Sequence, residues 1–379
     1  MGVFSQYLET LKGIDDIHAE RINQIKRIEE IRKRDVLTIA SDLSGNPGYI
    51  GIDYTDLLPV SDQLENLSGE AIDVILETPG GLAERAEDIV DMIRHKYKNV
   101  AFIVPGVAMS AGTIMVMAGD EILLGPNSSL GPIDAQVVSG NKRFSADAFI
   151  DGFNKIKKEV ADTNQLNRAY IPILQGISPA EIQACENAQN FARTLVTEWL
   201  AEWKFQNWEI HSSTGKKVTK EDKENRAGEI ADQLCKHSRW LTHNRSIKMD
   251  DLVEMKLKIT DYSQTPGLYD AIRRYYTLLR MAFENSSIFK IYETPKTRIY
   301  RAISGMQRQF EIAEIGFTCP QCRKTFKIQA NLGQKAPLKP GNLPFPANNK
   351  FKCPSCGQIS DLEQNRRTIE AQSKKKIVC

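Results

Sequence analysis

The sequence lacks the features that mark several large classes of protein. Its 379 residues contain no apolar run that approaches the ~18 residues of a membrane-spanning helix, so we predict no membrane span. No P-loop pattern GxxxxGK[ST] is present, and a built-in ATP-driven unfoldase is therefore not expected. The first residues are polar and have no apolar core of a secretory signal. These absences together favour a cytoplasmic protein.

Charge of one sign is also lacking, and cysteine and histidine are scarce. The 50 basic and 48 acidic residues give a formal net charge of +2, which provides no strong attraction to nucleic acid or to anionic membranes. Only five histidines and seven cysteines are present. Four of the cysteines form two CxxC pairs, which in a cytosolic chain favours metal binding over disulfides.

The middle of the chain has the pattern of a layered α/β domain. After a charged amphipathic helix over 1–34, short apolar runs closed by Gly or Pro predict buried strands. A helix with one apolar face, over 82–97, separates the second strand from the third, so the order strand, helix, strand predicts a parallel sheet. The predicted strands cover 36–43, 72–79, 100–106 and 121–126.

The remaining boundaries follow from helix signals and from the cysteines. Ser178, Pro179 and Glu181 mark a strong helix start, and a second helix is expected over 221–237. We predict that the α/β domain covers 35–265 and that a helical connector follows it. The predicted C-terminal segments are the connector at 266–314, a cysteine-containing unit at 315–362 and a basic tail at 363–379.

Two glycines follow the second predicted strand directly. In the run Glu77-Thr78-Pro79-Gly80-Gly81, glycines permit a sharp turn that leaves backbone N–H groups pointing outward. Such donors can stabilise a developing oxyanion, and removing one donor costs about 3–4 kcal/mol. The alternative is an ordinary tight turn between a strand and a helix.

Ser110 lies between the third predicted strand and an apolar helix. Its hydroxyl is expected near the helix N-terminus, where the helix dipole favours developing negative charge. The N–H of Ala111 is then a candidate second oxyanion donor beside Gly80 and Gly81. The alternative is that Ser110 is only a helix N-cap.

Taken together, these motifs resemble the Clp-fold serine peptidases, a group that includes ClpP, signal peptide peptidase A and NfeD-type peptidases. The run Gly106-x-x-x-Ser110-Ala111-Gly112 and the following AGDEILLGPNSSLGPID are most similar to the serine dehydrogenase proteinase family. The resemblance covers about residues 36–260. It implies an α/β, ClpP/crotonase-like fold of repeated ββα units, hydrolysis of peptide bonds in a protein or peptide substrate, and a homo-oligomer.

A nucleophilic serine requires a base, and the position where ClpP has a histidine reads Leu-Gly-Pro-Ile-Asp134 here. Asp134 is a weak proton acceptor and is expected to be a turn or orienting residue. The related peptidases with a Ser-Lys dyad place a lysine at a distance that falls on the helix at 145–163. We therefore predict Lys158, or Lys155 one turn earlier, as the base, with Lys157 the third candidate. The alternative is that all three are solvated surface charges.

His243 is the second candidate for the base. It precedes a predicted helix and strand, in a segment similar to a late motif of the family, although Asn244-Arg245-Ser246 departs from that motif. The alternative is a structural histidine in a loop.

Cys319, Cys322, Cys353 and Cys356 form two CxxC knuckles, the spacing that brings four thiolates around one tetrahedral Zn²⁺. We predict a structural zinc ribbon, because so small a unit buries too little surface to fold without metal. The ribbon is a candidate binding surface for a protein or nucleic-acid partner. Two alternatives to a peptidase remain open: a non-enzymatic Clp-fold scaffold that binds such a partner, and a crotonase-like acyl-CoA enzyme.

Overall fold

The computed structural model describes residues 2–139, 142–211, 214–303, 312–333, 336, 338–373 and 375–378. The chain forms two compact units, Met1–Ala302 and Ile303–Cys379, and each is described by itself. Within the described ranges, no helix combines the length and apolar character that crossing a membrane requires.

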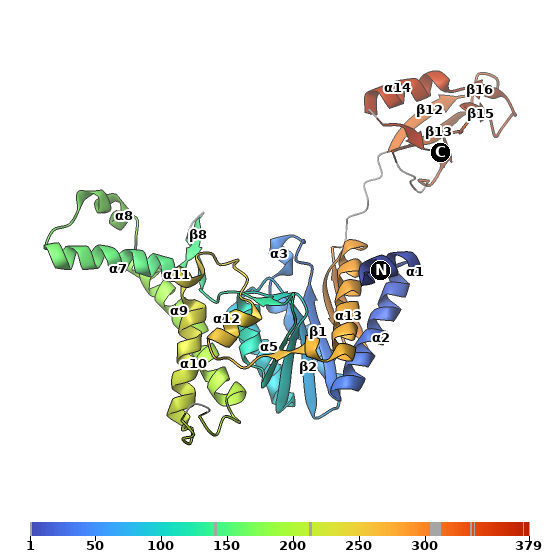
Figure 1. The fold of residues 1–379 in the computed structure, drawn as a ribbon. Coiled ribbons are helices and arrows are strands. Elements are labelled where there is room, and N and C mark those ends of the chain that lie inside the picture. Colours follow the sequence, from blue (N-terminus) through green and yellow to red (C-terminus); the bar gives the residue numbers. More distant parts are fainter. Residues whose placement is uncertain are drawn as a thin grey trace. The chain divides into compact units, whose positions relative to one another are not determined.

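Unit 1 is built on a seven-stranded sheet with the order β11-β10-β1-β2-β3-β5-β9 (Figure 1). The strands from β1 to β9 in this order pair in parallel, whereas β10 and β11 pair antiparallel at one edge. The four strands predicted from apolar runs are confirmed as β1, β2, β3 and β5. The strand bounds are β1 Asp35–Ser41, β2 Ala71–Glu77, β3 Asn99–Val104, β5 Glu121–Leu124, β9 Thr260–Asp261, β10 Ile288–Glu293 and β11 Arg298–Ala302.

Both faces of this sheet are buried, because successive residues of each central strand pack into different cores. In β1, Leu37 and Ile39 join the core beneath the helices α4, α5 and α6, whereas Val36 and Ala40 join the core beneath α1, α2 and α13. The predicted single helix over 1–34 is two helices, which end and begin around Gly13. The helix bounds are α1 Val3–Thr10, α2 Ile14–Arg32, α4 Leu57–Glu65, α5 Ala83–Lys96, α6 Ala111–Met117 and α13 Pro266–Glu284.

A second, smaller layer lies at the ends of the parallel strands. β4 (Val107–Ala108) pairs in parallel with β6 (Ser129–Leu130), and Thr78 and Ile247 form bridges to these two strands. The chain thus runs β3, β4, α6 and then β5, β6, as the predicted ββα repeats require. This layer carries Ser110 and the glycine turn.

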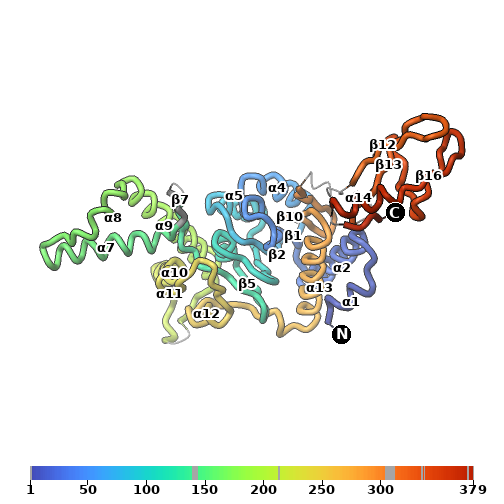
Figure 2. Tube along the Cα trace, turned by 90° about the horizontal axis from the view of Figure 1, so that it is seen from above, coloured from blue at the N-terminus to red at the C-terminus, as the bar shows by residue number. Residues whose placement is uncertain are grey.

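A helical arm extends from the sheet domain (Figures 1 and 2). The predicted helix starting at Ser178 is confirmed as α9, with Ser178 and Glu181 forming a capping box. The arm contains β7 Gln136–Ser139, β8 Lys142–Ser145, α7 Ala146–Thr163, η2 Arg168–Tyr170, α8 Ile171–Gln175 and α9 Pro179–Trp199. The other short elements and helices are α3 Pro47–Ile50, η1 Tyr54–Asp56, η3 Leu200–Lys204, α10 Lys220–Cys235, α11 His237–Trp240, α12 Met249–Glu254 and η4 Tyr262–Gln264.

The prediction of a helical connector over 266–314 is wrong beyond Glu284. α13 ends there, and β10 and β11 form a hairpin that pairs with β1. The hairpin covers the edge of β1 that would otherwise be unpaired, and its buried Ile291 and Tyr292 join the two cores. The sheet domain therefore extends to Ala302 and not to 265.

Unit 2 is a small β-rich domain. β13 pairs with β12, β14 and β17, and β15 pairs with β16. The segment predicted as a basic tail, 363–379, is not a tail, because α14 and β17 contribute Ile369 and Ile377 to the domain core. Lys374 and Cys379 of that segment lie outside the described residues. The bounds are β12 Ile312–Thr318, β13 Thr325–Leu332, β14 Asn342–Pro344, β15 Lys350–Lys352, β16 Ile359–Asp361, α14 Glu363–Ser373 and β17 Ile377–Val378.

Candidate active site and metal centre

Ser110 occupies a sharp turn between β4 and α6. Its backbone has φ 53° and ψ −119°, a conformation that side-chain-bearing residues seldom adopt. The turn is held by the Gly112 N–H, which donates to the Met109 carbonyl at 2.8 Å, and by the Ile114 N–H, which donates to the Ser110 carbonyl at 3.2 Å. The Ser110 side chain caps no N–H of α6. The expectation that Ser110 serves only as an N-cap therefore finds no support.

The glycine turn lies directly against Ser110. A Cβ at Gly80 would come within 2.6 Å of the Ser110 Cβ, and a Cβ at Gly81 would come within 2.3 Å of the Ile52 backbone. Both glycines have positive φ, 96° and 154°. The Gly80 N–H donates to Thr78 Oγ1 at 3.1 Å, whereas the N–H groups of Gly81 and Ala111 have no hydrogen-bond partner among the described residues. Gly81 and Ala111 are thus the donors that remain available to an oxyanion.

Asp134 and two histidines form a polar cluster next to this layer. The Asp134 side chain is fully buried, and its Oδ1 lies 2.6 Å from His243 Nδ1 while its Oδ2 lies 2.9 Å from His237 Nδ1. Burial opposes ionisation of Asp134, but hydrogen bonds from His243, His237 and Ser145 lower its pKa below the ordinary value. A carboxylate that accepts Nδ1–H of His243 fixes the tautomer in which Nε2 is a proton acceptor. Nε2 of His243 has no hydrogen-bond partner in the described part of the chain.

The loop that carries Asp134 is attached to the helix that follows Ser110. Gly131 lies three residues before Asp134. Its carbonyl accepts from Thr113 Oγ1 at 2.9 Å, and its N–H donates to the same Oγ1, also at 2.9 Å. A Cβ at Gly131 would lie 3.3 Å from the Met109 Cα, immediately before Ser110. Three residues span at most about 10 Å, so this attachment keeps Asp134 within that distance of Gly131. The bridge between Leu130 and Ile247 holds the His243 segment to the same loop.

The three candidate lysines lie on α7, in the arm. Lys155, Lys157 and Lys158 are all exposed, and α7 buries only Ala146 among its described side chains. The described contact of Lys157 is with the ring of Phe153 on the same helix. In the described part of a single chain, none of these three lysines therefore lies in an apolar pocket of the kind that keeps a lysine neutral.

The four knuckle cysteines converge, and their sulfur atoms lie within 4.8 Å of one another. Cys319 Sγ is 3.6 Å from Cys356 Sγ, and Cys322 Sγ is 3.7 Å from Cys353 Sγ. Four thiolates at about 2.3 Å from a tetrahedral Zn²⁺ would be about 3.8 Å apart, so the residues present fit such an ion.

The two knuckles have the same backbone geometry. Arg323 and Gly357, each directly after the second cysteine of its pair, both have positive φ and donate to the carbonyl of the first cysteine, at 2.9 and 3.0 Å. In the first knuckle, the N–H of Cys322 exerts the largest influence on the Cys319 thiol and lowers its pKa to about 6. A lowered pKa favours the thiolate, which is the form that binds metal.

Two functional candidates could not be identified by a sequence motif. His237 contacts Asp134 across 103 positions of the chain, and no local pattern signals this pairing. Glu77 belongs to the glycine motif, but nothing in the sequence signals a role for its side chain. The structure buries it completely between the two turns of the site.

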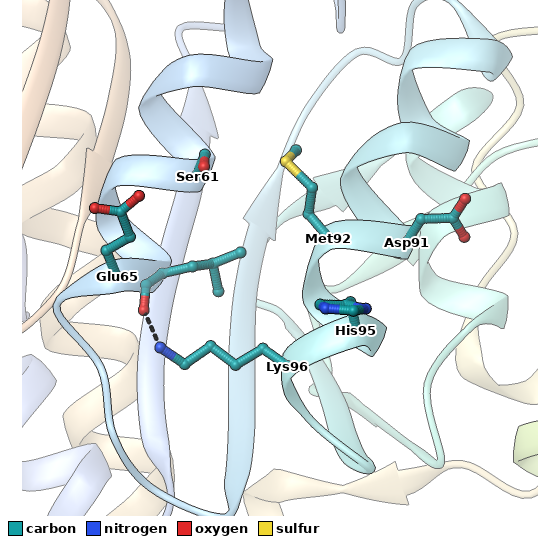
Figure 3. A pocket seen from close by; sticks show the side chains of 7 residues that line it. Ser61, Glu65, Asp91, Met92, His95 and Lys96 are labelled. Carbon is teal, nitrogen blue, oxygen red and sulfur yellow. Dashed lines mark hydrogen bonds between the residues drawn. The ribbon is translucent and has the colours of Figure 1, made fainter.

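A surface cavity of about 500 Å³ lies elsewhere, between α4 and α5 (Figure 3). Its Lys96 donates to the carbonyls of Leu64 and Leu67 at 2.5 and 2.7 Å and is thus engaged in holding α5 to the end of α4. None of the predicted site residues lines this cavity. Its lining residues are Ser61, Leu64, Glu65, Asp91, Met92, His95 and Lys96.

Comparison with known proteins agrees with the resemblance noted in the sequence. Residues 9–190 match the family described as ClpP-like SDH-type serine proteinase. Two uncharacterized proteins of Methanocaldococcus jannaschii are similar. One is 26% identical over 162 residues, which is 41% of this chain and 50% of that protein. The other is 27% identical over 191 residues, which is 48% of this chain and 62% of that protein. The chain thus spans between half and two thirds of the length of these curated relatives.

Two solved structures show distant similarity to this chain. A mutant of the 1510-N membrane-bound stomatin-specific protease is 15% identical with a TM-score of 0.32, over 58% of this chain and 79% of that chain. ClpP1 from Listeria monocytogenes is 14% identical with a TM-score of 0.32, over 62% of this chain and 93% of that chain.

Proposed function

We propose that this chain, whose residues 9–190 match the family described as ClpP-like SDH-type serine proteinase, hydrolyses peptide bonds with Ser110 as its nucleophile. The observation that carries the proposal is the strained turn at Ser110, packed against a glycine turn in which the Gly81 N–H has no hydrogen-bond partner among the described residues. Strained backbone at a partly exposed serine is typical of a nucleophile held toward its substrate.

We propose His243 as the general base and Asp134 as the group that orients it. His243 Nε2 would take the proton of Ser110 Oγ as the oxygen attacks the scissile carbonyl, and would then give it to the leaving amine. Asp134, accepting from Nδ1 at 2.6 Å, would stabilise the imidazolium formed in between. The N–H groups of Gly81 and Ala111 would stabilise the oxyanion, and water would complete hydrolysis by the same steps.

This proposal departs from the lysine base predicted from the resemblance. The buried carboxylate next to His243 supports the imidazole, whereas the exposed positions of Lys155 and Lys158 give the lysine alternative no support in a single chain. A lysine remains an option only if assembly buries α7 against Ser110 of another copy.

Variant kinetics on a dye-quenched unfolded protein separates the two bases. His243→Ala should lower the rate of hydrolysis about 10²–10⁴-fold, the usual worth of a general base. The Lys158→Ala and Lys155→Ala variants, which remove exposed charges, serve as matched controls and should retain activity within a few fold. Full activity of His243→Ala with loss of activity in Lys158→Ala would reverse the assignment. No hydrolysis by the wild-type chain would favour the scaffold alternative.

We infer that unit 2 holds one structural Zn²⁺ on its four knuckle cysteines. The ion would stabilise the fold of the ribbon and take no part in hydrolysis. The shared geometry of the two knuckles supports this proposal. Elemental analysis of protein purified without added metal should find one zinc per chain, and a fully folded ribbon without metal would contradict the proposal.

We also propose that the arm assembles the chain into a homo-oligomer. Half-buried apolar residues follow one face of α7, and Ile171 and Ile173 of α8 are 40% and 52% exposed. A contiguous apolar face of this kind favours a protein partner. Light scattering should give a mass that is a multiple of 42.7 kDa, and Phe153→Glu should reduce it. A monomeric wild-type chain would contradict this proposal.

For the ribbon we propose a nucleic-acid partner. Residues 303–379 contain 13 basic and 5 acidic residues, a formal net charge of +8, which leaves −6 for residues 1–302. A Zn²⁺ with four thiolates would remove two charges, and the remaining excess favours a phosphate backbone. Affinity for a single-stranded oligonucleotide should fall steeply with salt. Absence of oligonucleotide binding at low salt would favour the protein partner instead.

A further inference from the structure

Glu77 lies beneath the candidate active site and contacts both of its turns. It is the last residue of β2, directly before the Thr78–Gly81 turn that supplies an oxyanion donor. Its Oε2 accepts from the Val107 N–H of β4 at 2.9 Å, and β4 leads into Ser110. Its Oε1 accepts from the Tyr276 hydroxyl of α13 at 3.1 Å. The carboxylate thus connects the oxyanion turn, the nucleophile strand and a supporting helix.

The space around this carboxylate is closed. A Cβ at Gly106 would come within 2.6 Å of Glu77 Oε2 and within 2.3 Å of the Tyr276 hydroxyl oxygen. Gly106 also fixes the neighbouring strand, because its carbonyl accepts from the Ser129 N–H at 2.9 Å. Movement of the Glu77 carboxylate would therefore be transmitted to β4 and to Ser110.

We infer that Glu77 is a positioning residue that keeps Ser110 and the Gly81 N–H in register, and that it does so only as a carboxylate. This inference rests on the proposed function of Ser110. An ionised carboxylate accepts from both donors at once, whereas the protonated acid has one oxygen that carries a hydrogen and faces a donor. A proton on Oε2 would oppose the Val107 N–H, whereas a proton on Oε1 would reverse the contact with Tyr276, because a phenol oxygen can also accept. Protonation therefore weakens or reverses one of the two connections.

The surroundings of Glu77 place this protonation within an accessible pH range. Burial is the largest influence and raises its pKa to about 7, although Val107, Tyr276 and Arg280 act in the opposite direction. The facing groups are Tyr276 and Arg280 of α13 and Tyr262 of η4, and Arg280 is paired with Asp42 at 3.5 Å. The folded state holds its proton to higher pH than the unfolded chain does. Ionisation of Glu77 thus costs stability as pH rises from about 4.5 to 7.

The test compares the wild-type chain with Glu77→Gln, a neutral isostere, over pH 5.5 to 8.5. The readout is the rate at which a fluorophosphonate labels Ser110. At pH 8.5 the variant should react about 10²-fold more slowly, the loss expected from a small misplacement of reacting groups. At pH 5.5 the two rates should converge, because Glu77 of the wild type is then protonated. A constant ratio at all pH values would show a merely structural effect and overturn the inference.

Two further measurements keep the inference separate from the proposed function. Tyr276→Phe removes one donor to the carboxylate. The labelling profile of this variant should therefore have its inflection at higher pH than the wild-type profile. This measurement decides the inference if Glu77→Gln fails to fold. Hydrogen exchange of the 104–112 amides needs no labelling of Ser110. Above pH 7, exchange should be faster in Glu77→Gln than in the wild type, and equal exchange would overturn the inference. Labelling that persists in Ser110→Ala would refute the assignment of Ser110 as the nucleophile. The hydrogen-exchange result would then decide the role of Glu77 by itself.

Discussion

The backbone conformation of Ser110 serves its proposed function but lowers the stability of the fold. A non-glycine residue in such a rarely populated conformation costs of order 1–3 kcal/mol, which the surrounding turn must hold in place. Gly80 makes the conformation possible, because any larger residue there would overlap the Ser110 Cβ. The strained serine and the unsubstituted glycine are thus two parts of one steric arrangement.

Replacing Ser110 by glycine should therefore stabilise the fold. Compared with Ser110→Ala, which keeps the strain, Ser110→Gly should raise the free energy of unfolding by about 1 kcal/mol, since glycine adopts positive φ at little cost. Denaturant unfolding of the two inactive variants measures the difference. A Ser110→Gly variant that is no more stable than Ser110→Ala would argue against strain at this turn.

Asp134 is the residue on which two histidines depend. Asp134→Asn should lower hydrolysis about 10²–10⁴-fold, because an amide no longer fixes the tautomer of His243. The lowered pKa of Asp134 adds a stability effect, which is present above the pKa of the unfolded chain and is lost as pH falls through the folded value. Steady-state kinetics at neutral pH and acid unfolding of both proteins measure the two effects. Unchanged kinetics would contradict the orienting role.

At the scale of elements, the short segment from Gly51 to Asp56 links the edge hairpin to the oxyanion turn. Lys290 of β10, only 2% exposed, donates to the Gly51 carbonyl at 2.6 Å and to Asp56 at 2.8 Å. The next residue, Ile52, donates to the Gly80 carbonyl at 2.7 Å and bridges to Gly81. A buried ion pair between Lys290 of the hairpin and Asp56 of η1 therefore supports the glycine turn from behind.

Removing one member of this pair should be more damaging than removing both. Lys290→Met leaves Asp56 buried without its cation and should cost about 3–5 kcal/mol of stability. The double variant with Asp56→Leu should recover much of that loss, because no uncompensated charge remains. Denaturant unfolding measures the stability of the single and double variants. Equal stability of Lys290→Met and the double variant would contradict a buried charge effect.

The elements that were predicted correctly have sequence signals within a short window, whereas the elements that were missed depend on contacts with distant residues. Strands β1, β2, β3 and β5 are continuous apolar runs, buried on both faces, and such runs are visible in a short window. The hairpin of β10 and β11 was predicted as helix because it follows α13 directly and places charged residues such as Lys290 among its apolar ones. Lys290 is buried because β10 pairs with β1, about 250 positions away, and because Asp56 pairs with its ammonium group.

The candidate site divides in the same way. Ser110, the two glycines and the four cysteines belong to compact motifs, and the sequence alone was sufficient to single them out. The contact between Asp134 and His243 joins positions 109 apart, so a single sequence gave no means to prefer this histidine over a lysine.

At the scale of the whole molecule, the two units have separate cores and should lose their structure independently. The ribbon core contains few buried apolar residues, so its stability should depend on the metal. A strong chelator should unfold residues 312–378 and leave the unfolding transition of unit 1 unchanged within error. Hydrogen exchange of both units with and without chelator measures this. Joint unfolding of both units, or none, would contradict the proposed structural role of zinc.

The most direct test of the central proposal is the site of covalent labelling by a fluorophosphonate, mapped by mass spectrometry of peptides from the full chain. We expect a single adduct on Ser110 and strong slowing of labelling in His243→Ala. Labelling should be lost in Ser110→Ala, with the far-ultraviolet circular dichroism unchanged. An adduct on another serine, or equal labelling of Ser110→Ala, would contradict the account.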